Sequence, residues 1–550
     1  MKTINKPHPI YVLCSFATIS KTWKIVIVFL LCFHSTIGMI IYGQNTPPSN
    51  DLCGAAQSLG TLVLGGEDSV TGNTQDATTN DAPDDCGSGV DNEESGGVWY
   101  TFTGTGMRFY EISTCDAGTT IDTEVSVYFG TCNNLTCLDG NDNDGTCTEG
   151  GGASSSTTTV STLVDGGEPT NYYVYVKGQA SSVGNFALNI NDLSPTNDEC
   201  FEATSILPPE GGTITLNGTN TFSTTADAPV NCGDGINNTD GPGVWYQFNP
   251  RPNSTYEIST CSDDTNFDTE VSVYRGTWCG GLFCETGNDD DGLCTQGSGG
   301  TSSTVTVTNP GNSPRPFFIY VKGNGGGTGD FEITVTEFPG ELLLAIKAFL
   351  EGPYDPVSGL MNDDLRSLGL IPNTEPYNTD GATVDASVLA VSGADAIVDW
   401  VLVELRGQFN NTAISHSRTA LLQRDGDIVD TDGVSPLRFT YAIEDNYFVS
   451  IRHRNHLGLL TFDTRSLNSA VTTIDFTNSA TTVYGSTASR LDLGAGILGL
   501  YGADTNASGA VDATDRSNAW NDRNQNGYLN SDCDLNGITN ATDRSITWNN

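Results

Sequence analysis

The sequence predicts a mainly β protein made of several β-sandwich domains. At 550 residues the chain is too long for one ordinary hydrophobic core, and its length predicts three or four domains. Its 63 glycines, with many threonines, serines, asparagines and aspartates, favour short strands joined by tight turns. Stretches such as "TEVSVY" and "YYVYVKG" alternate or run apolar over the length of a strand. We therefore expect tandem disulfide-linked β-sandwiches, a third β-sandwich-like domain and a small α-helical module at the C-terminus.

The N-terminal residues 1–43 predict an export signal peptide. Four lysines and no acidic residue accompany the apolar run "WKIVIVFLLCFHSTIGMIIYGQ". A retained membrane anchor is the alternative, because the run from Ile25 to Ile41 is nearly long enough to span a bilayer. In both cases we expect a secreted protein or one held on the cell surface.

The charge balance limits the possible partners. The formal net charge is -44, and loss of Lys2, Lys6, Lys21 and Lys24 with the N-terminal segment would take it to -48. A chain this acidic is repelled by phosphate backbones and anionic membrane surfaces. We expect no nucleic-acid partner, no membrane contact unless the N-terminal segment is retained, and an affinity for divalent cations.

Residues 50–192 and 197–337 are two copies of one module. Their motifs recur in order, among them "GVWYTF" and "GVWYQF", "YEISTC" twice, and "IDTEVSVY" and "FDTEVSVY". Six cysteines recur as well, each displaced by 146 or 147 positions: Cys53, Cys86, Cys115, Cys132, Cys137 and Cys147 return as Cys200, Cys232, Cys261, Cys279, Cys284 and Cys294.

An even number of cysteines in an exported module favours three disulfides per copy. Zinc is the alternative, but neither copy has a C-x-x-C pair or a histidine. Sequence alone does not fix the connectivity. We expect Cys132 to pair with Cys137 across a hairpin, which leaves Cys53 with Cys86 and Cys115 with Cys147.

The aromatic sets of the two copies invite two interpretations. Trp99, Tyr100 and Phe102, repeated as Trp245, Tyr246 and Phe248, could form a ligand platform. A strand that alternates aromatic residues usually buries one face, so we expect these rings in the core.

The order of "GVWYTF", "DTEVSVY", an acidic "GNDND" turn, "YYVYVKG" and "GNFALNI" resembles the bacterial pre-peptidase C-terminal domain. The resemblance implies a β-sandwich carried by secreted hydrolases and surface proteins, which binds calcium or extended polymers in some members and acts as a spacer in others. These copies depart from the family in being longer and in having six cysteines. Their acidic turns offer oxygen ligands of the type that calcium takes, and a solvated turn is the alternative: Asp122, Asp142 and Asp144 in the first copy, Asp268, Asp289, Asp290 and Asp291 in the second.

Residues 339–500 predict a separate β-rich domain without cysteine, through strand-like stretches such as "AIVDWVLVELRG". It is similar to a domain that often precedes a C-terminal repeat in secreted bacterial surface proteins, which implies no function. His416, His453 and His456 raise the question of a metal site. Side chains three apart on a strand face opposite ways, so we expect His453 and His456 not to share an ion unless the strand ends between them. We expect instead that Arg452 and Arg454 pair with nearby acids.

Residues 501–550 contain two loops with the spacing of a calcium loop, which uses positions 1, 3, 5, 7, 9 and 12 with glycine at 6. Position 7 contributes a backbone carbonyl, and each loop is followed by "RS" and then a tryptophan. The expected ligands are Asp504, Asn506, Ser508, Ala510, Asp512 and Asp515 in the first loop, and Asp532, Asp534, Asn536, Ile538, Asn540 and Asp543 in the second.

This pair of loops resembles the dockerin type I repeat. The resemblance implies a calcium-folded module that docks onto cohesin, with Ala513, Thr514, Ala541 and Thr542 facing such a partner. Ser508 replaces a carboxylate or amide, so the first site should be the weaker. Cys533 is left over after the twelve repeat cysteines pair, and it is either free or joins two chains.

No H-E-x-x-H, G-x-S-x-G or P-loop motif occurs. We therefore expect an exported, non-catalytic binding or adhesion protein, stabilised by calcium and disulfides, whose partner is an extracellular glycan or protein polymer or a surface receptor. One alternative is an accessory component of a polysaccharide-degrading assembly, docked through its dockerin-like C-terminus to a cohesin-like domain. Another is a secreted hydrolase with its site in residues 339–500.

Overall fold

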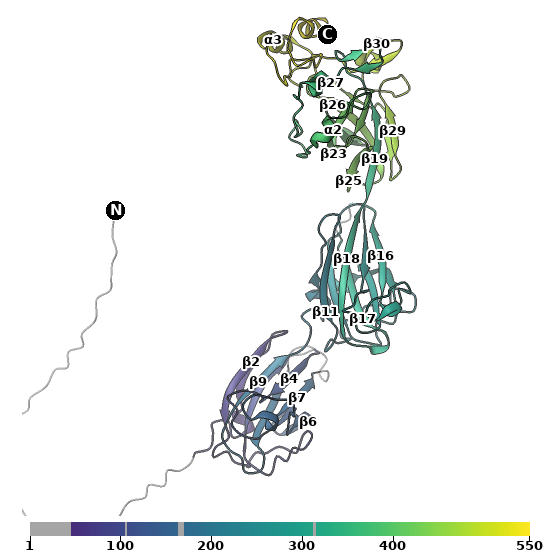
Figure 1. Cartoon of the computed structure of the whole chain (residues 1–550). Helices are drawn as coiled ribbons and strands as arrows, with labels where there is room; N and C mark the ends of the chain where they lie inside the picture. The colour runs from purple at the N-terminus through teal and green to yellow at the C-terminus, as the bar shows by residue number, and fades with distance from the viewer. Residues whose placement is uncertain (1–45, 105–106, 163–169, 312–314) are drawn as a thin grey trace, which may run out of the picture. The chain divides into compact units, whose positions relative to one another are not determined.

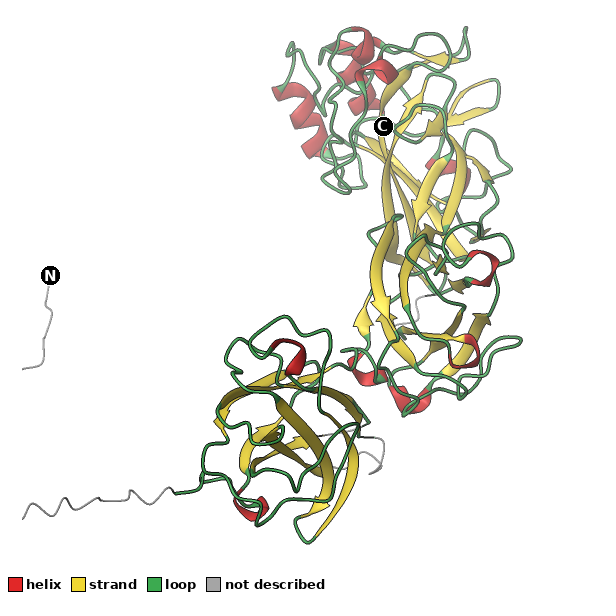
Figure 2. Ribbon diagram, turned by 60° about the horizontal axis from the view of Figure 1, so that its bottom comes forward, coloured by secondary structure: helices red, strands yellow, loops and turns green. Residues whose placement is uncertain are grey.

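The computed structural model describes residues 46–104, 107–162, 170–311 and 315–550 (Figure 1). The expected signal peptide at residues 1–43 lies outside this range. Strands make up 41% of the protein and helices 9%, so the mainly β prediction is confirmed. Figure 2 shows strands as the main element of the described chain, with its longest helices near its C-terminus. Within the described ranges, no helix is long and apolar enough to cross a membrane.

The first module is a sandwich of two sheets that pack around one apolar core. Val98, Tyr100 and Phe102 from one sheet meet Tyr110 and Phe186 from the other. The five-stranded sheet has the order β1 (Gln57–Thr61), β3 (Gly97–Gly104), β8 (Thr170–Gly178), β5 (Thr123–Thr131) and β6 (Asn134–Asn141). The four-stranded sheet has the order β2 (Glu67–Asn73), β9 (Asn185–Asp192), β4 (Phe109–Ser113) and β7 (Thr157–Ser161).

The second module repeats this topology strand for strand, as expected of a duplication. Its five-stranded sheet has the order β10 (Thr204–Ser205), β12 (Gly243–Phe248), β17 (Phe317–Gly323), β14 (Thr269–Arg275) and β15 (Phe283–Asn288). Its four-stranded sheet has the order β11 (Thr213–Thr219), β18 (Asp330–Pro339), β13 (Ser254–Ser259) and β16 (Thr304–Asn309).

The aromatic sets belong to the cores, so the ligand-platform alternative is wrong for these residues. Trp99 and Trp245 are fully buried, each in a small cluster with two cysteines and two tyrosines or more. The Trp245 ring nitrogen donates to Asp227 Oδ1 at 3.0 Å, which satisfies the polar edge of a buried indole. Alternation along the strand places Tyr100 and Phe102 on the same side, between the sheets.

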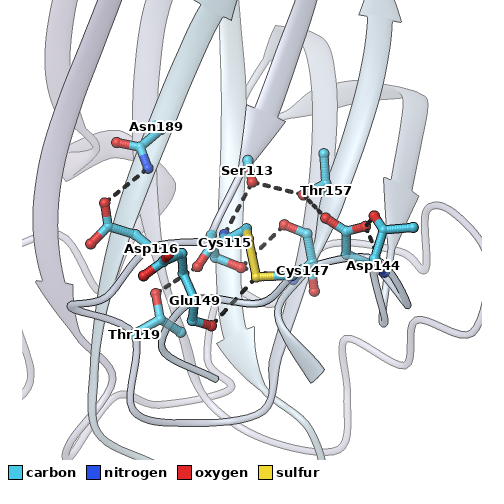
Figure 3. The surroundings of a disulfide bond; sticks show 12 residues. Ser113, Cys115, Asp116, Thr119, Asp144, Cys147, Glu149, Thr157 and Asn189 are labelled. Atoms are coloured by element: carbon cyan, nitrogen blue, oxygen red, sulfur yellow. Dashed lines mark hydrogen bonds between the residues drawn. A yellow bond between two sulfur atoms is a disulfide. The ribbon is translucent and has the colours of Figure 1, made fainter. Parts of the chain in front are cut away.

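Six disulfides form, three in each module, but their connectivity corrects our expectation. The bonds are Cys53–Cys132, Cys86–Cys137 and Cys115–Cys147, with Cys200–Cys279, Cys232–Cys284 and Cys261–Cys294 in the second copy. Cys132 lies in the turn after β5, whereas Cys137 lies within β6 opposite Tyr128. The two are not facing positions of the hairpin, and each bonds instead to the loop that precedes β1 or β3. Only the Cys115–Cys147 pairing agrees with the prediction (Figure 3).

Residues 339–500 form one branched nine-stranded sheet where we expected a sandwich-like domain. Its main path is β25 (Leu437–Thr440), β19 (Glu341–Lys347), β24 (Asp427–Val429), β23 (Asn410–Gln423), β22 (Ile397–Gly407), β26 (Asp445–His453) and β27 (His456–Leu460). The sheet branches because β19 pairs with β24, β25 and β29 (Thr472–Asp475) along different parts of its length, while β28 (Arg465–Leu467) pairs with β26. Short elements complete the domain: β20 (Tyr354–Asp355), β21 (Leu360–Met361), α1 (Asp364–Ser367), α2 (Ala386–Leu389), β30 (Leu491–Gly494) and β31 (Ile497–Gly499).

The C-terminal segment, residues 501–550, holds the helices α3 (Ala513–Asn521) and α4 (Ala541–Asn549). Each helix begins with a capping box, in which Asp512 or Asn540 caps the first turn and Asp515 or Asp543 returns to the cap backbone. Leu535 is buried in the same core cluster as the nine-stranded sheet, and Tyr528 packs against it. The segment and residues 339–500 therefore share one core.

Candidate cation sites and an open groove

The second C-terminal loop gathers three carboxylates, as the sequence predicts. Ligand oxygens of Asp532, Asp534 and Asp543 lie within 4.8 Å of one another, and Asp532 and Asp543 are fully buried. Asp532 accepts from the backbone of Asn536 at 3.2 Å and of Gly537 at 2.8 Å. Gly537 has φ +85°, which a residue with a side chain rarely adopts.

The first loop repeats these bonds, but its third carboxylate is exposed where that of the second loop is half-buried. Asp504 accepts from the backbone of Ser508 and Gly509, both at 2.8 Å, while Asp515 accepts from the Asp512 backbone at 2.8 Å. The Ser508 hydroxyl donates to the carbonyl of Ala510 at 3.1 Å, so the loop's own carbonyl occupies it. Asp504 and Asp515 are buried, but Asp512 is exposed at the start of α3.

The remaining expected ligands of the second loop also shape the loop itself. Asn536 Oδ1 accepts from the Ile538 backbone at 3.0 Å, and Asn540 Oδ1 accepts from Thr542 at 2.6 Å as the cap of α4. The Ile538 carbonyl accepts from Asn540 Nδ2 at 3.3 Å. The amide and carbonyl oxygens therefore lie beside the three carboxylates, in the donor set that calcium prefers.

The carboxylate cluster of the second loop makes no direct ion pair among the described residues, although the nearby charge of Arg454 acts to lower the pKa of Asp532. Burial and the charges of Asp543 and Asp532 raise the pKa of Asp534 above its usual range. Among the described residues, no lysine or arginine forms an ion pair with Asp532, Asp534 or Asp543. These residues fit a divalent cation, and the second loop fits it better than the first.

A buried polar network that the sequence did not indicate joins this loop to the nine-stranded sheet. Asp399, fully buried on β22, accepts from the Tyr528 hydroxyl at 2.5 Å and from Arg454 Nε at 2.9 Å. Arg454 also donates to the Leu529 carbonyl, and Asn455 Nδ2 donates to the Asp532 carbonyl at 2.7 Å. The alternation of β22 gave no sign of this network, because Asp399 lies beside a strand irregularity.

His453 and His456 face each other, because the strand ends between them, which is the exception that our strand argument allowed. Strand β26 ends at His453, β27 begins at His456, and the two residues pair directly across the turn. Their Nδ1 atoms are 3.0 Å apart, while His453 Nε2 lies 3.2 Å from Asp399 and His456 Nε2 lies 2.7 Å from the Glu351 carbonyl. Burial lowers the pKa of both imidazoles. The absence of a transition metal from this domain stays a prediction.

The expected partners of the two arginines are confirmed: Arg454 pairs with Asp399, and Arg452 lies 3.5 Å from Glu404. His416 lies apart from the histidine pair, beside the Tyr447 ring. Cys533 is the cysteine without a disulfide among the described residues, and its full burial keeps it from a second chain in this conformation.

The acidic turns of the two modules contain two kinds of aspartate. Asp144 Oδ2 accepts from the Thr157 hydroxyl at 2.7 Å and Asp144 Oδ1 from the Thr146 backbone at 3.3 Å, close to the Cys115–Cys147 bond (Figure 3). Its counterpart Asp291 accepts from Thr304 at 2.7 Å. These two aspartates stabilise the turn. In contrast, Asp268, Asp289 and Asp290 bring oxygens within 4.8 Å of one another.

An open groove lies where the nine-stranded sheet meets the C-terminal segment. Its cavity volume is about 680 Å³, within the usual range of ligand sites. The sheet contributes Arg406, Ser450, Arg452 and Leu460, and the segment contributes Asp504, Val511, Asn549 and Asn550.

A cluster of three aromatic side chains, two of them exposed, lies beside the groove. Phe448 on β26 lies opposite Arg406 on β22 in the register of the two strands. The even-numbered residues of β26, Phe448 among them, lie on the face of the sheet opposite the core. The rings of Phe448 and Phe462 lie 6.1 and 5.1 Å from that of Tyr484, whose backbone donates to Leu460. Phe462 is 53% exposed. This aromatic cluster, Phe448, Phe462 and Tyr484, therefore lies next to the wall residue Leu460, and the sequence pattern did not single it out.

No family model and no curated protein matches the sequence of this chain. Solved structures give partial likenesses. The tandem CBM51 modules of a family 98 glycoside hydrolase from Streptococcus pneumoniae SP3-BS71 are 12% identical, over 44% of this chain and 82% of that chain, with a TM-score of 0.12.

Two other solved structures are similar at the same level. The ANXUR2 extracellular domain from Arabidopsis thaliana is 10% identical over 49% of this chain and 88% of that one, with a TM-score of 0.14. The CBM32-1 and CBM32-2 domains of Clostridium perfringens ZmpB are 10% identical over 49% and 92%, also with a TM-score of 0.14. Likenesses of this size carry no inference about function.

Proposed function

We propose that this chain is an extracellular, non-catalytic protein that binds a glycan polymer in the groove beside its C-terminal segment. The observation that carries the proposal is the groove itself, an open polar channel whose wall residue Leu460 is hydrogen-bonded to the backbone of Tyr484, beside the rings of Phe448 and Phe462. Six disulfides support an oxidising, extracellular setting.

The chemistry of the groove favours a sugar over other polymers. Exposed rings offer flat apolar faces to the C–H faces of a pyranose, while Arg452, Ser450 and Asn549 offer hydrogen-bond partners for hydroxyl groups. Arg406 and Arg452 share Glu404, which leaves one positive charge on the sheet side of the groove, and Asp504 places one negative charge on the segment side. The net charge of -44 repels polyanions, which leaves a neutral glycan as the best fit.

Calcium in the C-terminal loops belongs to the same proposal. The carboxylates Asp532, Asp534 and Asp543 support a strong site, and Asp504 and Asp515 a weaker one. When bound, the ion would supply the positive charge that these buried carboxylates lack.

A second candidate function, docking onto a cohesin-like partner, rests on the dockerin-like sequence. One observation favours it: Ala513, Thr514, Ala541 and Thr542 are all exposed, although the Tyr528 side of the segment packs against the sheet. Pull-down of the full chain on immobilised cohesins, with Thr514→Asp as the matched variant, tests it.

Affinity electrophoresis of the full chain in gels that contain β-glucan, xylan, mannan or hyaluronan tests the groove. We expect retardation by a neutral glycan, lost on Phe462→Ala and weakened by Arg452→Gln. Phe283→Ala, which removes a ring exposed to 62% in the second module, is the control and should leave retardation unchanged. Retardation by hyaluronan alone, or equal retardation of wild type and Phe462→Ala, would refute the proposal.

A further inference from the structure

A lysine is fully buried at the same place in each sandwich module. Lys177 on β8 and Lys322 on β17 are both 0% exposed, and each lies beside a buried glutamate of the neighbouring strand. In the second module the register of β14 and β17 sets Glu270 directly opposite Lys322, and Glu270 Oε2 lies 2.8 Å from Lys322 Nζ. Lysine is almost never fully buried unless it is paired, so these contacts decide what the amine does.

The second module places another carboxyl group against its lysine. Asp240, in the loop before β12, accepts from Lys322 Nζ at 2.8 Å, and the Gly323 carbonyl accepts from it at 3.0 Å. The side chain of Asp240 is 35% exposed, whereas that of Glu270 is 2% exposed. The amine therefore lies between a buried carboxylate and a second carboxylate that reaches water. We call Lys322, Asp240 and Glu270 the lysine triad.

The surroundings of the lysine triad favour transfer of a proton from the amine to the glutamate. Lys322 lies on the same face of the sheet as Tyr320, whose register partner is Trp245, and both rings are buried. Glu270 Oε2 has no hydrogen bond from any other described residue. Burial raises the pKa of Glu270. Transfer of one proton leaves Lys322 with a neutral amine, which is the nucleophilic form of lysine.

We propose that an amide bond joins Lys322 Nζ to the side-chain carbon Cγ of Asp240 and forms within the folded second module. Glu270 takes one proton from the ammonium, and the free amine attacks Asp240 Cγ. The bond from Cγ to one carboxyl oxygen then breaks. This oxygen leaves as water with the proton that Glu270 returns and a second proton from the nitrogen. The reaction needs no oxidant or other reactant, and Glu270 ends as it began, with the new amide N–H as its donor.

Two features favour this reaction over that of a free lysine and a free aspartate in water. The fold holds the amine at hydrogen-bond distance from the carboxyl group that it attacks. Groups held in reactive contact behave as if present at about 10⁵ to 10⁸ M, which offsets the competition from water. The released water reaches solvent, because Asp240 is partly exposed.

The first module is a matched control within the same chain. Glu94 occupies the position equivalent to Asp240, and its carboxylate accepts from the Ala180 backbone at 3.3 Å. Among the described residues, the acid within ion-pair distance of Lys177 Nζ is Glu124, at 2.8 Å. Lys177 therefore has the proton acceptor but not the carboxyl group to attack, and we expect no bond there.

Tryptic mapping of the full chain, after reduction and denaturation, tests the proposal. Trypsin does not cleave after an acylated lysine, so wild type should resist cleavage after Lys322. It should give one branched peptide that contains Asp240 and is lighter by one water than its two parts. Cleavage after Lys177 should be complete. Asp240→Ala and Glu270→Gln should each restore cleavage after Lys322, whereas Glu124→Gln in the first module should leave the branched peptide unchanged.

Asp240→Ala alters a partly exposed loop residue, so it serves if Glu270→Gln does not fold. Recovery of the Cys232–Cys284 bond in an unreduced digest shows that a variant has folded. Complete cleavage after Lys322 in wild type, without a branched peptide, would overturn the proposal and leave a buried ion pair. A branched peptide at wild-type yield in folded Glu270→Gln would overturn the role given to Glu270.

Discussion

The hydroxyl of Tyr528 should stabilise the core that residues 339–500 share with the C-terminal segment. It donates to Asp399 Oδ1 at 2.5 Å, and Asp399 is fully buried. Tyr528→Phe removes this hydrogen bond and keeps the ring, over which the Arg454 guanidinium lies at 4.0 Å. The change therefore tests one bond to a buried charge.

The size of the effect follows from what Asp399 retains. Arg454 Nε at 2.9 Å, His453 Nε2 at 3.2 Å and the Trp400 backbone at 2.8 Å still contact the carboxylate. Because the charge stays compensated, we expect the loss of a single hydrogen bond to a charged group, about 1.5 to 3 kcal/mol. For a body of this size each kcal/mol lowers the melting temperature by about 2 to 4 °C, so the shift should be about 3 to 12 °C.

Differential scanning calorimetry of the full chain measures this shift in the transition of residues 339–550. Tyr484→Phe is the matched control, because its ring belongs to the exposed aromatic cluster and its hydroxyl makes no contact with Asp399. A shift below about 1 °C for Tyr528→Phe would refute the reasoning, since so small an effect is that of a surface substitution.

Replacing both Cys115 and Cys147 with alanine should lower the unfolding free energy of the first module by about 3 to 4 kcal/mol, because their bond closes a loop of 32 residues. Peptide mapping of the unreduced chain should recover the Cys53–Cys132 bond, and recovery of a Cys132–Cys137 peptide instead would contradict the structure. Asp532→Ala should weaken calcium binding to the full chain more than Ser508→Ala does. Asp532 is a fully buried member of the carboxylate cluster, whereas the Ser508 hydroxyl already donates to the Ala510 carbonyl. Equal calcium affinities of the two variants in calorimetry would contradict this prediction. Burial raises the pKa of Asp198 to about 7. Between about pH 4 and pH 7 the folded second module therefore holds a proton that the unfolded chain has released, so the stability of the module should fall as the pH rises through this window. Asp198→Asn should make the melting temperature less dependent on pH over the same window.

The duplication and the strand content were accessible from the sequence because they rest on local pattern. Alternation along "GVWYTF" is enough to place Tyr100 and Phe102 in the core, and the spacing of aspartates around Gly537 is enough to bring Asp532 and Asp543 together. Both features depend on residues close to one another in the chain.

Contacts between distant segments were not accessible in this way. The pairing of Cys53 with Cys132 depends on how a loop before β1 reaches a hairpin 79 residues later. The facing of His453 and His456 depends on one turn ending a strand, and the network of Asp399 with Tyr528 joins positions 129 residues apart. Within the turn itself, Asp142 and Asp144 are the same residue type, but Asp144 accepts from the Thr157 hydroxyl whereas Asp142 Oδ1 is buried without a hydrogen bond.

The connectivity of the disulfides also sets the path that a pulling force takes through each module. Tension that enters at Cys53 crosses directly to Cys132, so strands β1 to β5, which lie between them, carry no load. The bond Cys200–Cys279 shields β10 to β14 in the same way. Each shielded loop of 79 residues withholds about 260 to 280 Å of extended chain. A chain held at both ends would therefore release little extra length when a module unfolds under shear, as long as its disulfides stay oxidised. Reduction of Cys53–Cys132 and Cys200–Cys279 would allow both modules to extend much further.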